Sequence, residues 1–220
     1  MKKDKAKKSS RSHTQYKSKD GEILPGASTV ANMLAKEALL PWANKLGREG
    51  IDYTSYMRAT GRIGTLGHYL ILCHIKGEKP DLAEYSPDEI DQAENSLLSY
   101  FEWEKRHTLE PILMETPLVD ETWRFGGTLD WYGKLDGNLA ILDYKTGSGI
   151  WDSYWIQISG YLKLLESNNY KCDEVWILNI PRTEDDSFID QRKDMADLRP
   201  YLHIFSHLLG IWWIKRSLKK

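Results

Sequence analysis

The sequence predicts one α/β domain in which helices flank a mixed central sheet, in the order helix, three strands, helix, strand. Two observations predict it. Strand-like runs flank Asp136-Gly137, which favours a two-residue hairpin because a type I′ turn needs positive φ at both central positions; that turn would pair Leu135 with Asn138. A helical segment then leads to an apolar run at residues 174–180, and such a crossover joins parallel strands.

Composition suits a soluble protein. The chain has 220 residues and a formal net charge of −2, enough for one domain with a sizeable core. Cys73 and Cys172 make no disulfide framework and favour a reducing compartment. The apolar runs are too short to cross a bilayer, and the N-terminus lacks the apolar segment of a secretory signal. We expect a cytoplasmic protein with no membrane partner.

The two ends of the chain are basic. Residues 1–25 are polar and without periodicity, so we expect a disordered arm, followed by a single folded domain over residues 26–220. The C-terminus closes on a second basic run, residues 215–220. Basic ends on a mildly acidic body suit contacts with phosphates, and they equally suit solubilising tails. Both interpretations stay open.

The first helix is predicted to begin at Ser28 or Thr29 and to run until Pro41, with a second short helix from Trp42. Trp42 suits either a stacking contact with a base or a buried aromatic anchor.

A further helix is predicted over residues 66–75, with Thr65 as its N-cap. His68 falls in the first turn of this helix. A lone histidine on an apolar helix is most often a core residue, and His74 is interpreted in that way.

The next helix should begin at Ser86, because a serine N-cap, a proline and acidic residues follow one another there, and it should end near Thr108. Residues 112–119 then form a strand, and Pro117 indicates either an edge position for this strand or its end. Glu115 lies within it, either as a solvated glutamate or near a functional site.

The hairpin register carries chemistry. Stepping outward from its turn brings Asp130 opposite Asp143, with Cβ atoms about 4.5–5.5 Å apart. Like charges opposed in this way need a neutralising partner. Lys145 lies two residues beyond Asp143 and therefore shares its face of the strand. Two acids and a lysine on buried strands favour a hard divalent cation, whereas the alternative is a solvated surface hairpin.

The helix after the hairpin is predicted to begin at Asp152 and to end near Asn168. Gln157 and Tyr161 are four residues apart and share one of its faces. Tyr161 is otherwise explained as a core residue. A final apolar helix is expected over residues 198–218.

These motifs resemble a known superfamily. Asp130 followed by Asp143-Tyr144-Lys145 resembles the D…(D/E)-x-K signature of PD-(D/E)XK nucleases. The flanking residues, Gly126-Gly127-Thr128-Leu129 before the first acid and Thr146-Gly147 after the lysine, resemble the RecB-like branch, which includes phage exonucleases and CRISPR-associated nucleases. The likeness covers residues 60–182 and implies a restriction-endonuclease-like core in αβββαβ order, with added N- and C-terminal helices. Some members hold an iron–sulfur cluster with four cysteines, and this chain has two, so none is implied.

The resemblance also implies roles for individual residues. A shared Gly-Thr-x-x-His-like motif makes His68 a metal ligand, and an acid on the strand of Glu115 lies near the metal in several members. A Gln-x-x-x-Tyr motif makes Gln157 and Tyr161 contacts to the DNA backbone. Lys145 would orient or help deprotonate the attacking water. The implied metal ligands are His68, Asp130, Asp143, the carbonyl of Tyr144, and Glu115; the implied catalytic residues are Lys145, Asp130, Asp143, Gln157 and Tyr161.

The implied activity is Mg²⁺-dependent hydrolysis of DNA, with Mn²⁺ as a substitute. The type would be a phage exonuclease of recombination, replication or DNA processing, with DNA and a single-strand annealing or other recombination protein as partners, in the host cytoplasm. A structure-specific endonuclease and a catalytically silent DNA-binding or assembly protein are the alternatives. The sequence leaves open the polarity, the strandedness, the choice of DNA or RNA, the number of metals and the oligomeric state.

Overall fold

The computed structural model describes residues 14–34, 39–183 and 186–219. Its centre is a five-stranded sheet in the order β3-β4-β5-β6-β7. Strands β3 (Leu109–Asp120), β4 (Phe125–Leu135) and β5 (Asn138–Lys145) are antiparallel neighbours, β6 (Glu174–Asn179) runs parallel to β5, and β7 (Ile189–Asp194) closes the sheet antiparallel to β6. The predicted mixed α/β sheet, its order of elements and the edge position of β3 are confirmed.

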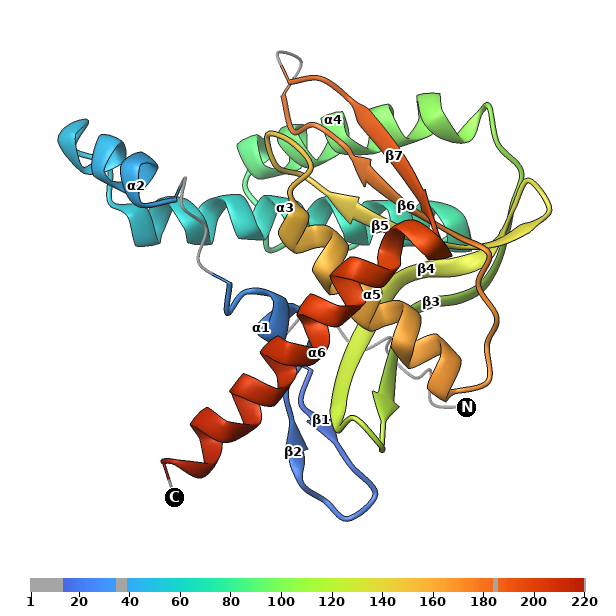
Figure 1. Ribbon diagram of the computed structural model, residues 1–220. Helices are drawn as coiled ribbons and strands as arrows, with labels where there is room; N and C mark the ends of the chain where they lie inside the picture. The colour runs from blue at the N-terminus through green and yellow to red at the C-terminus, as the bar shows by residue number, and fades with distance from the viewer. Residues whose placement is uncertain (1–13, 35–38, 184–185, 220) are drawn as a thin grey trace, which may run out of the picture.

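Helices cover both faces of this sheet (Figure 1). On one face, the core cluster joins the sheet to α1 (Ala27–Ala31), α5 (Asp152–Ser167) and α6 (Met195–Ser217). On the other face, a second cluster joins it to α3 (Tyr53–Lys76) and α4 (Pro87–Glu104). The remaining helix, α2 (Leu39–Arg48), projects from the body and rests on the start of α3. The sheet is therefore covered by helices on both faces.

The β4–β5 hairpin has the predicted turn. Leu135 pairs with Asn138, and the two central residues have φ of 51° at Asp136 and 93° at Gly137. A Cβ atom on Gly137 would meet nothing within 4 Å. Glycine is therefore favoured there by the positive φ alone.

The expected disordered arm is wrong for the part of it that the structure describes, residues 14–25. Strands β1 (Tyr16–Lys17) and β2 (Ile23–Leu24) form a hairpin beside β4. The ring of Tyr16 packs on Gly126, where a Cβ atom would lie 2.4 Å from that ring, and its hydroxyl lies 2.9 Å from the hydroxyl of Thr128. Residues 1–13 of the predicted arm lie outside the described part of the chain.

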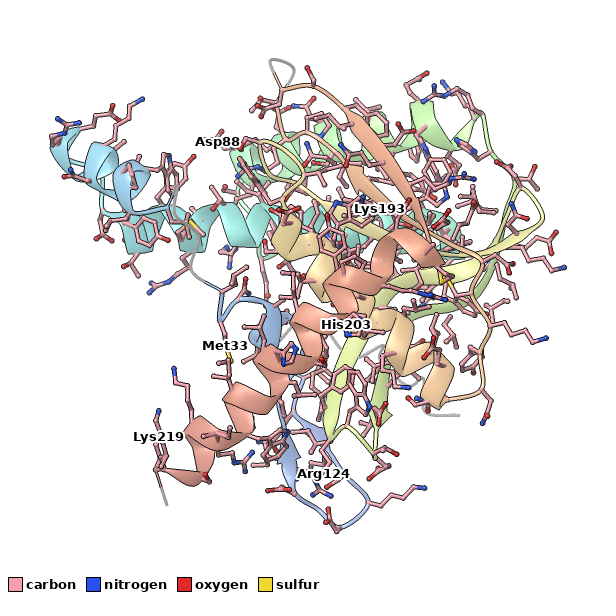
Figure 2. The ribbon with its side chains drawn as sticks, viewed as in Figure 1. Met33, Asp88, Arg124, Lys193, His203 and Lys219 are labelled. Carbon is pink, nitrogen blue, oxygen red and sulfur yellow. The ribbon has the colours of Figure 1, made fainter. Side chains whose placement is uncertain are left out.

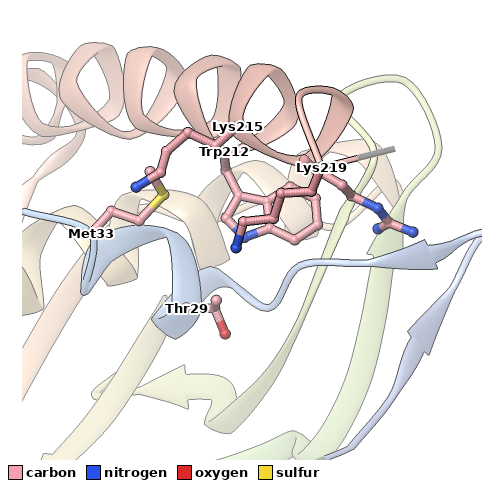
Figure 3. Close-up of a pocket in the computed structure, with 6 residues that line it drawn as sticks. Thr29, Met33, Trp212, Lys215 and Lys219 are labelled. Atoms are coloured by element: carbon pink, nitrogen blue, oxygen red, sulfur yellow. The ribbon is translucent and has the colours of Figure 1, made fainter.

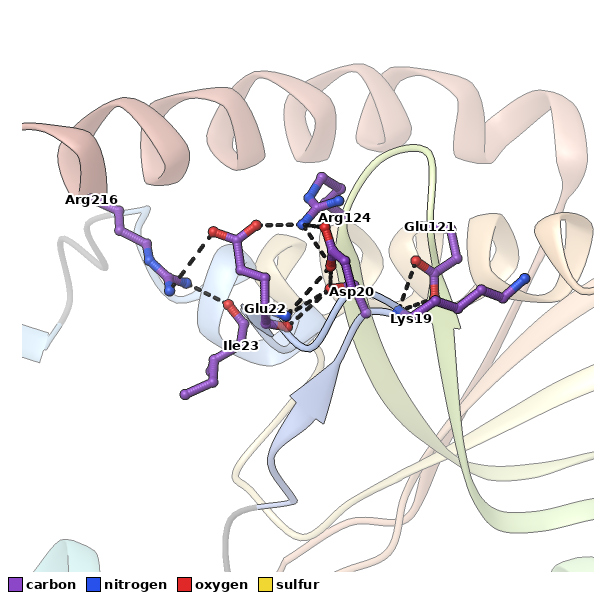
Figure 4. A network of polar contacts seen from close by, with 8 residues as sticks. Lys19, Asp20, Glu22, Ile23, Glu121, Arg124 and Arg216 are labelled. Carbon is purple, nitrogen blue, oxygen red and sulfur yellow. Dashed lines mark hydrogen bonds and ion pairs between the residues drawn. The ribbon is translucent and has the colours of Figure 1, made fainter.

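Ion pairs tie this hairpin to two distant elements (Figure 4), and Figure 2 shows where Arg124 lies in the whole molecule. Arg124, at the tip of the β3–β4 turn, contacts Asp20 at 3.2 Å and Glu22 at 2.5 Å. Arg216, near the end of α6, lies 4.0 Å from Glu22 and donates to the carbonyl of Ile23. This polar and basic segment is thus ordered by contacts with residues distant in the sequence, which hydrophobic periodicity does not reveal.

Helix boundaries correct two further predictions. Helix α1 ends at Ala31, and Pro41 lies in the first turn of α2, where the missing N–H costs no hydrogen bond. Trp42 packs edge-on against Tyr53 and Tyr56, which is the arrangement of an aromatic anchor.

The helix expected to start at Thr65 begins at Tyr53, with Asp52 as its N-cap. Glycines inside α3 suggested a boundary, yet Gly64 allows close approach to Thr146, whose Oγ1 would lie 2.8 Å from a Cβ atom. The predicted N-cap at Ser86 is confirmed, and Glu89 completes a capping box there, although α4 ends at Glu104 rather than near Thr108.

Candidate active site

The two acids of the hairpin lie where β4 and β5 separate. The β4–β5 ladder ends at Trp131 and Leu142, one step short of the predicted pairing of Asp130 with Asp143. Beyond that step the Asp130 side chain takes the place of a main-chain carbonyl, because its Oδ2 accepts a hydrogen bond of 2.9 Å from the amide of Tyr144. The direct cross-strand pair is therefore wrong, although the two carboxylates remain neighbours: besides burial, which is the largest cause, the charge of Asp130 raises the pKa of Asp143.

Lys145 neutralises Asp143. Its Nζ lies 2.5 Å from Asp143 Oδ2, and the two side chains are 15% and 2% exposed. Burial raises the pKa of the Asp143 carboxyl above its ordinary value, while Lys145 opposes that shift. The same ammonium lies 4.9 Å above the ring centre of Tyr154. Asp143 and Lys145, which were predicted to share a face of the strand, thus form a buried ion pair, and the Lys145 ammonium packs on the ring of Tyr154.

A second group of side chains converges on Asp130. Ligand atoms of His68, Glu115 and Asp130 all lie within 4.8 Å of one another. His68 is buried and places its Nδ1 3.2 Å from Asp130 Oδ1. One imidazole nitrogen and two carboxylates from three separate elements form a donor set that suits Mg²⁺ or Mn²⁺. Asp143, a predicted ligand, is not among these three, because its carboxylate contacts Lys145.

Glu115 reaches this group through an irregular strand. The β3–β4 ladder pairs Met114 with Trp131 and Thr116 with Leu129, so Glu115 lies beside Asp130. Its φ is 45°, a left-handed conformation that costs about 1–3 kcal/mol for a residue other than glycine. The strand therefore turns the Glu115 side chain toward α3 at a local cost in stability, as is common at functional sites.

His68 is positioned by the packing of α3. Gly64, one turn earlier, lets the helix approach Thr146, and Gly67 lies against Thr146 and Ser96. The imidazole ring packs edge-on against the buried ring of Tyr144, with centroids 5.6 Å apart. The glycines before His68 therefore let α3 pack closely, and this packing places His68 beside the point where β4 and β5 separate.

Gln157 and Tyr161 lie on α5, near Asp143 and Asp130. The Nε2 of Gln157 donates to the Tyr161 hydroxyl at 2.6 Å. The Tyr161 ring is buried against Gly127, where a Cβ atom would lie 2.8 Å from it. Burial, and then the charges of Asp143 and Asp130, raise the pKa of Tyr161 well above its ordinary value. Tyr161 is thus a core residue whose hydroxyl is near the acids, which joins the two interpretations of this residue.

Two further residues lie near the site: the sequence analysis did not name Tyr154, and it named Thr146 only as part of the flanking motif. Tyr154 lies under the Lys145 ammonium, and Thr146 receives the glycines of α3. Thr146 directly follows the Asp143-Tyr144-Lys145 motif, so its position was a usable signal. Tyr154 carried no signal, because the loop of residues 146–151 decides which side chain of α5 turns back toward β5.

Comparisons with known proteins add solved structures only. No family model and no curated protein matches the chain. A putative exonuclease from Eubacterium rectale has 12% sequence identity and a TM-score of 0.45, with 66% of this chain and 64% of that chain covered. The alkaline exonuclease LHK-Exo from Laribacter hongkongensis has 15% identity and a TM-score of 0.37, with 88% and 92% covered. LHK-Exo in complex with dAMP has 13% identity and a TM-score of 0.38, with 89% and 93% covered.

The chain thus spans less than two thirds of the length of the Eubacterium rectale protein, 64%. Identities and TM-scores at this level assign no activity to the chain. In the part that the structure describes, no helix is long and apolar enough to cross a membrane. The function is therefore argued from the chain's own side chains.

Proposed function

We propose that this protein is a divalent-metal-dependent nuclease that hydrolyses phosphodiester bonds of DNA. The observation that carries the proposal is the convergence of His68, Glu115 and Asp130 beside the buried Asp143–Lys145 ion pair. Carboxylates from three strands rarely gather in a buried place without a cation to offset their repulsion. Mg²⁺ keeps several waters and binds phosphate oxygens, so a small set of protein ligands suffices.

The residues would have two roles: some would bind the cation, and others would position the substrate. His68, Glu115 and Asp130 would hold the cation, and Asp143 and the carbonyl of Tyr144 are further candidates beside them. When bound, the cation lowers the pKa of a water molecule and stabilises negative charge on the reacting phosphate.

Lys145, held by Asp143 and by the Tyr154 ring, presents a fixed positive charge to that phosphate or to the attacking water. Tyr161, like any tyrosine, is protonated at neutral pH, and burial raises its pKa further, so its hydroxyl is a hydrogen-bond donor. With the Gln157 amide, which already contacts it, this hydroxyl would hold the DNA backbone.

The finer assignment extends the same proposal. A RecB-like exonuclease of phage type, Mg²⁺ as the working metal, an annealing protein as partner and a cytoplasmic location rest on the likeness of the Gly-Gly-Thr-Leu-Asp and Leu-Asp-Tyr-Lys-Thr-Gly motifs. A catalytically silent DNA-binding protein is disfavoured, because Asp130, Asp143 and Lys145 are all present and close together.

The test compares linear and covalently closed circular duplex DNA, with Mg²⁺ and with chelator. We expect the linear duplex to be degraded and the closed circle to survive, and only when metal is present. Glu115→Gln would weaken the hold on the cation and Asp143→Asn would release Lys145. Each change should lower the rate by about 10²–10³-fold, the usual cost of losing one cation or donor that stabilises transition-state charge.

Glu110→Gln is the matched control, because Glu110 is an exposed acid on the same strand β3 that pairs with Lys134. Its rate should equal that of the wild type. Hydrolysis that persists in chelator, or no hydrolysis of either duplex by the wild type, would contradict the proposal.

A further inference from the structure

A cationic groove lies away from the acids, between α1 and the C-terminal end of α6 (Figure 3). Its volume is about 340 Å³. Trp212, Lys215 and Lys219 point from α6 toward α1 in this view. The lining residues are Thr29, Met33, Trp212, Lys215, Arg216 and Lys219. The groove therefore combines one aromatic ring and one thioether with a rim of three cations.

The groove is held in shape by Arg216. This guanidinium lies 5.3 Å from the ring centres of both Trp212 and Trp213, and it also contacts Glu22 and the carbonyl of Ile23. Those contacts fix Trp212 from one side and tie it to the β1–β2 hairpin (Figure 4). The aromatic wall of the groove is thus ordered before any ligand arrives, which lowers the entropic cost of binding.

Lys215 and Lys219 carry charge that the described residues do not offset. Both are exposed, both line the groove, and no ion pair is recorded for either within residues 14–34, 39–183 and 186–219. They lie one helical turn apart, where like charges repel by a few tenths of a kcal/mol. Cations near a helix C-terminus are favoured by the helix dipole, yet that preference does not require them to line an apolar groove beside an aromatic ring.

The groove and the acids are linked through α1 and β4. Gly26, at the start of α1, forms a bridge to Gly126 on β4. Gly126 precedes Asp130 by four residues, which is about 13 Å along a strand. The main chain therefore connects the α1 side of the groove with the strand that carries Asp130.

We propose that this groove binds a single-stranded stretch of nucleic acid, with a base stacked on Trp212 and adjacent phosphates on Lys215 and Lys219. This proposal rests on the proposed nuclease function and names the single strand as the form that the protein grips. Aromatic rings flanked by cations bind single strands because every base offers a stacking face and every phosphate a charge. An acidic peptide matches the cations and leaves Trp212 without a stacking partner.

The experiment measures binding of a fluorescent oligothymidylate to the full chain in chelator, where hydrolysis does not proceed. Trp212→Leu should weaken binding at least about fivefold, since stacking on one ring contributes roughly 1–3 kcal/mol per base. Lys215→Gln/Lys219→Gln should flatten the slope of log K against log salt by about 1.4, because each neutralised phosphate of a single strand contributes about 0.7.

The matched control is Lys76→Gln/Lys79→Gln, two exposed lysines near the end of α3, which should keep the wild-type slope. Thermal unfolding of each variant checks that it is folded. Wild-type affinity in a folded Trp212→Leu variant would overturn the proposal. The proposal would also be overturned if Lys215→Gln/Lys219→Gln lost binding to phosphatidylserine vesicles or to polyglutamate but kept binding to the oligonucleotide.

The two proposals fail separately. If the wild type hydrolyses DNA with Mg²⁺ while Trp212→Leu binds the oligonucleotide normally, the groove assignment fails and the nuclease assignment stands. If the wild type hydrolyses nothing while Trp212→Leu and the double lysine variant both weaken binding, the groove assignment stands without the nuclease.

Discussion

Removing the Lys145 ammonium should unbalance the most buried charge of the site. Lys145→Met keeps the side-chain stem above Tyr154 and leaves Asp143, 2% exposed, beside Asp130 without its cation. Breaking a buried ion pair from one side costs about 3–5 kcal/mol. Because the Lys145 side chain is itself 15% exposed, we expect the lower end, about 3 kcal/mol. In a domain of this size each kcal/mol lowers Tm by roughly 2–4 °C, so Tm should fall by about 6–12 °C.

The control removes the stranded charge as well. Asp143→Asn/Lys145→Met has a neutral amide in place of the buried carboxylate, so it should recover more than half of the lost stability. The assay is thermal and urea unfolding of both variants and the wild type at pH 7.5 in chelator. A Lys145→Met variant with the wild-type Tm, or a double variant no more stable than the single one, would refute the buried ion pair.

Three further outcomes follow from contacts elsewhere. Gly137→Val should lower the free energy of unfolding by about 1–2 kcal/mol and remove much of the metal-dependent activity, since a β-branched residue is strained at φ 93°. Gly137→Asn should keep both the stability and the activity, and equal Tm and activity for the two variants would contradict this reasoning. Arg62 and the amide of Ser86 lower the pKa of Glu89 to about 2, so Glu89→Gln should cost about 1 kcal/mol at pH 6. Because a depressed carboxyl pKa stabilises only the ionised form, that difference should vanish as pH falls from about 4.5 through 2, and a difference that persists at pH 2 would refute the ion pair as its cause. Burial raises the pKa of the Cys172 thiol to about 12, so alkylation by iodoacetamide at pH 8 should be slow in the folded protein and fast after denaturation, as mass spectrometry of the Cys172 peptide would show.

The parts of the fold that depend on local chemistry were predictable from the sequence. The turn at Asp136-Gly137 follows from the backbone preferences of two adjacent residues. The helix start at Ser86 follows from its serine N-cap, the proline after it and the acids of the first turn. The parallel β5–β6 pairing followed from the handed helical crossover. In each case the deciding contacts lie within a few residues of one another or are fixed by chain topology.

The parts decided by distant contacts were not predictable in this way. Tyr16 orders a basic segment by packing on Gly126, which is far away in sequence. The Asp130–Asp143 pairing failed because a side-chain carboxylate replaced a main-chain carbonyl at the step where β4 leaves β5. Glu115 was placed near the metal by resemblance alone, since its left-handed conformation leaves no pattern in the sequence.

The central claim is that His68, Glu115 and Asp130 together bind a divalent cation. The most direct measurement is an anomalous difference map from crystals soaked in Mn²⁺, which substitutes for Mg²⁺ and can be located by its scattering. The account predicts a peak at bonding distance from a nitrogen of His68 and from carboxylate oxygens of Glu115 and Asp130. A map with no peak there, or with a peak that contacts none of these three side chains, would contradict it.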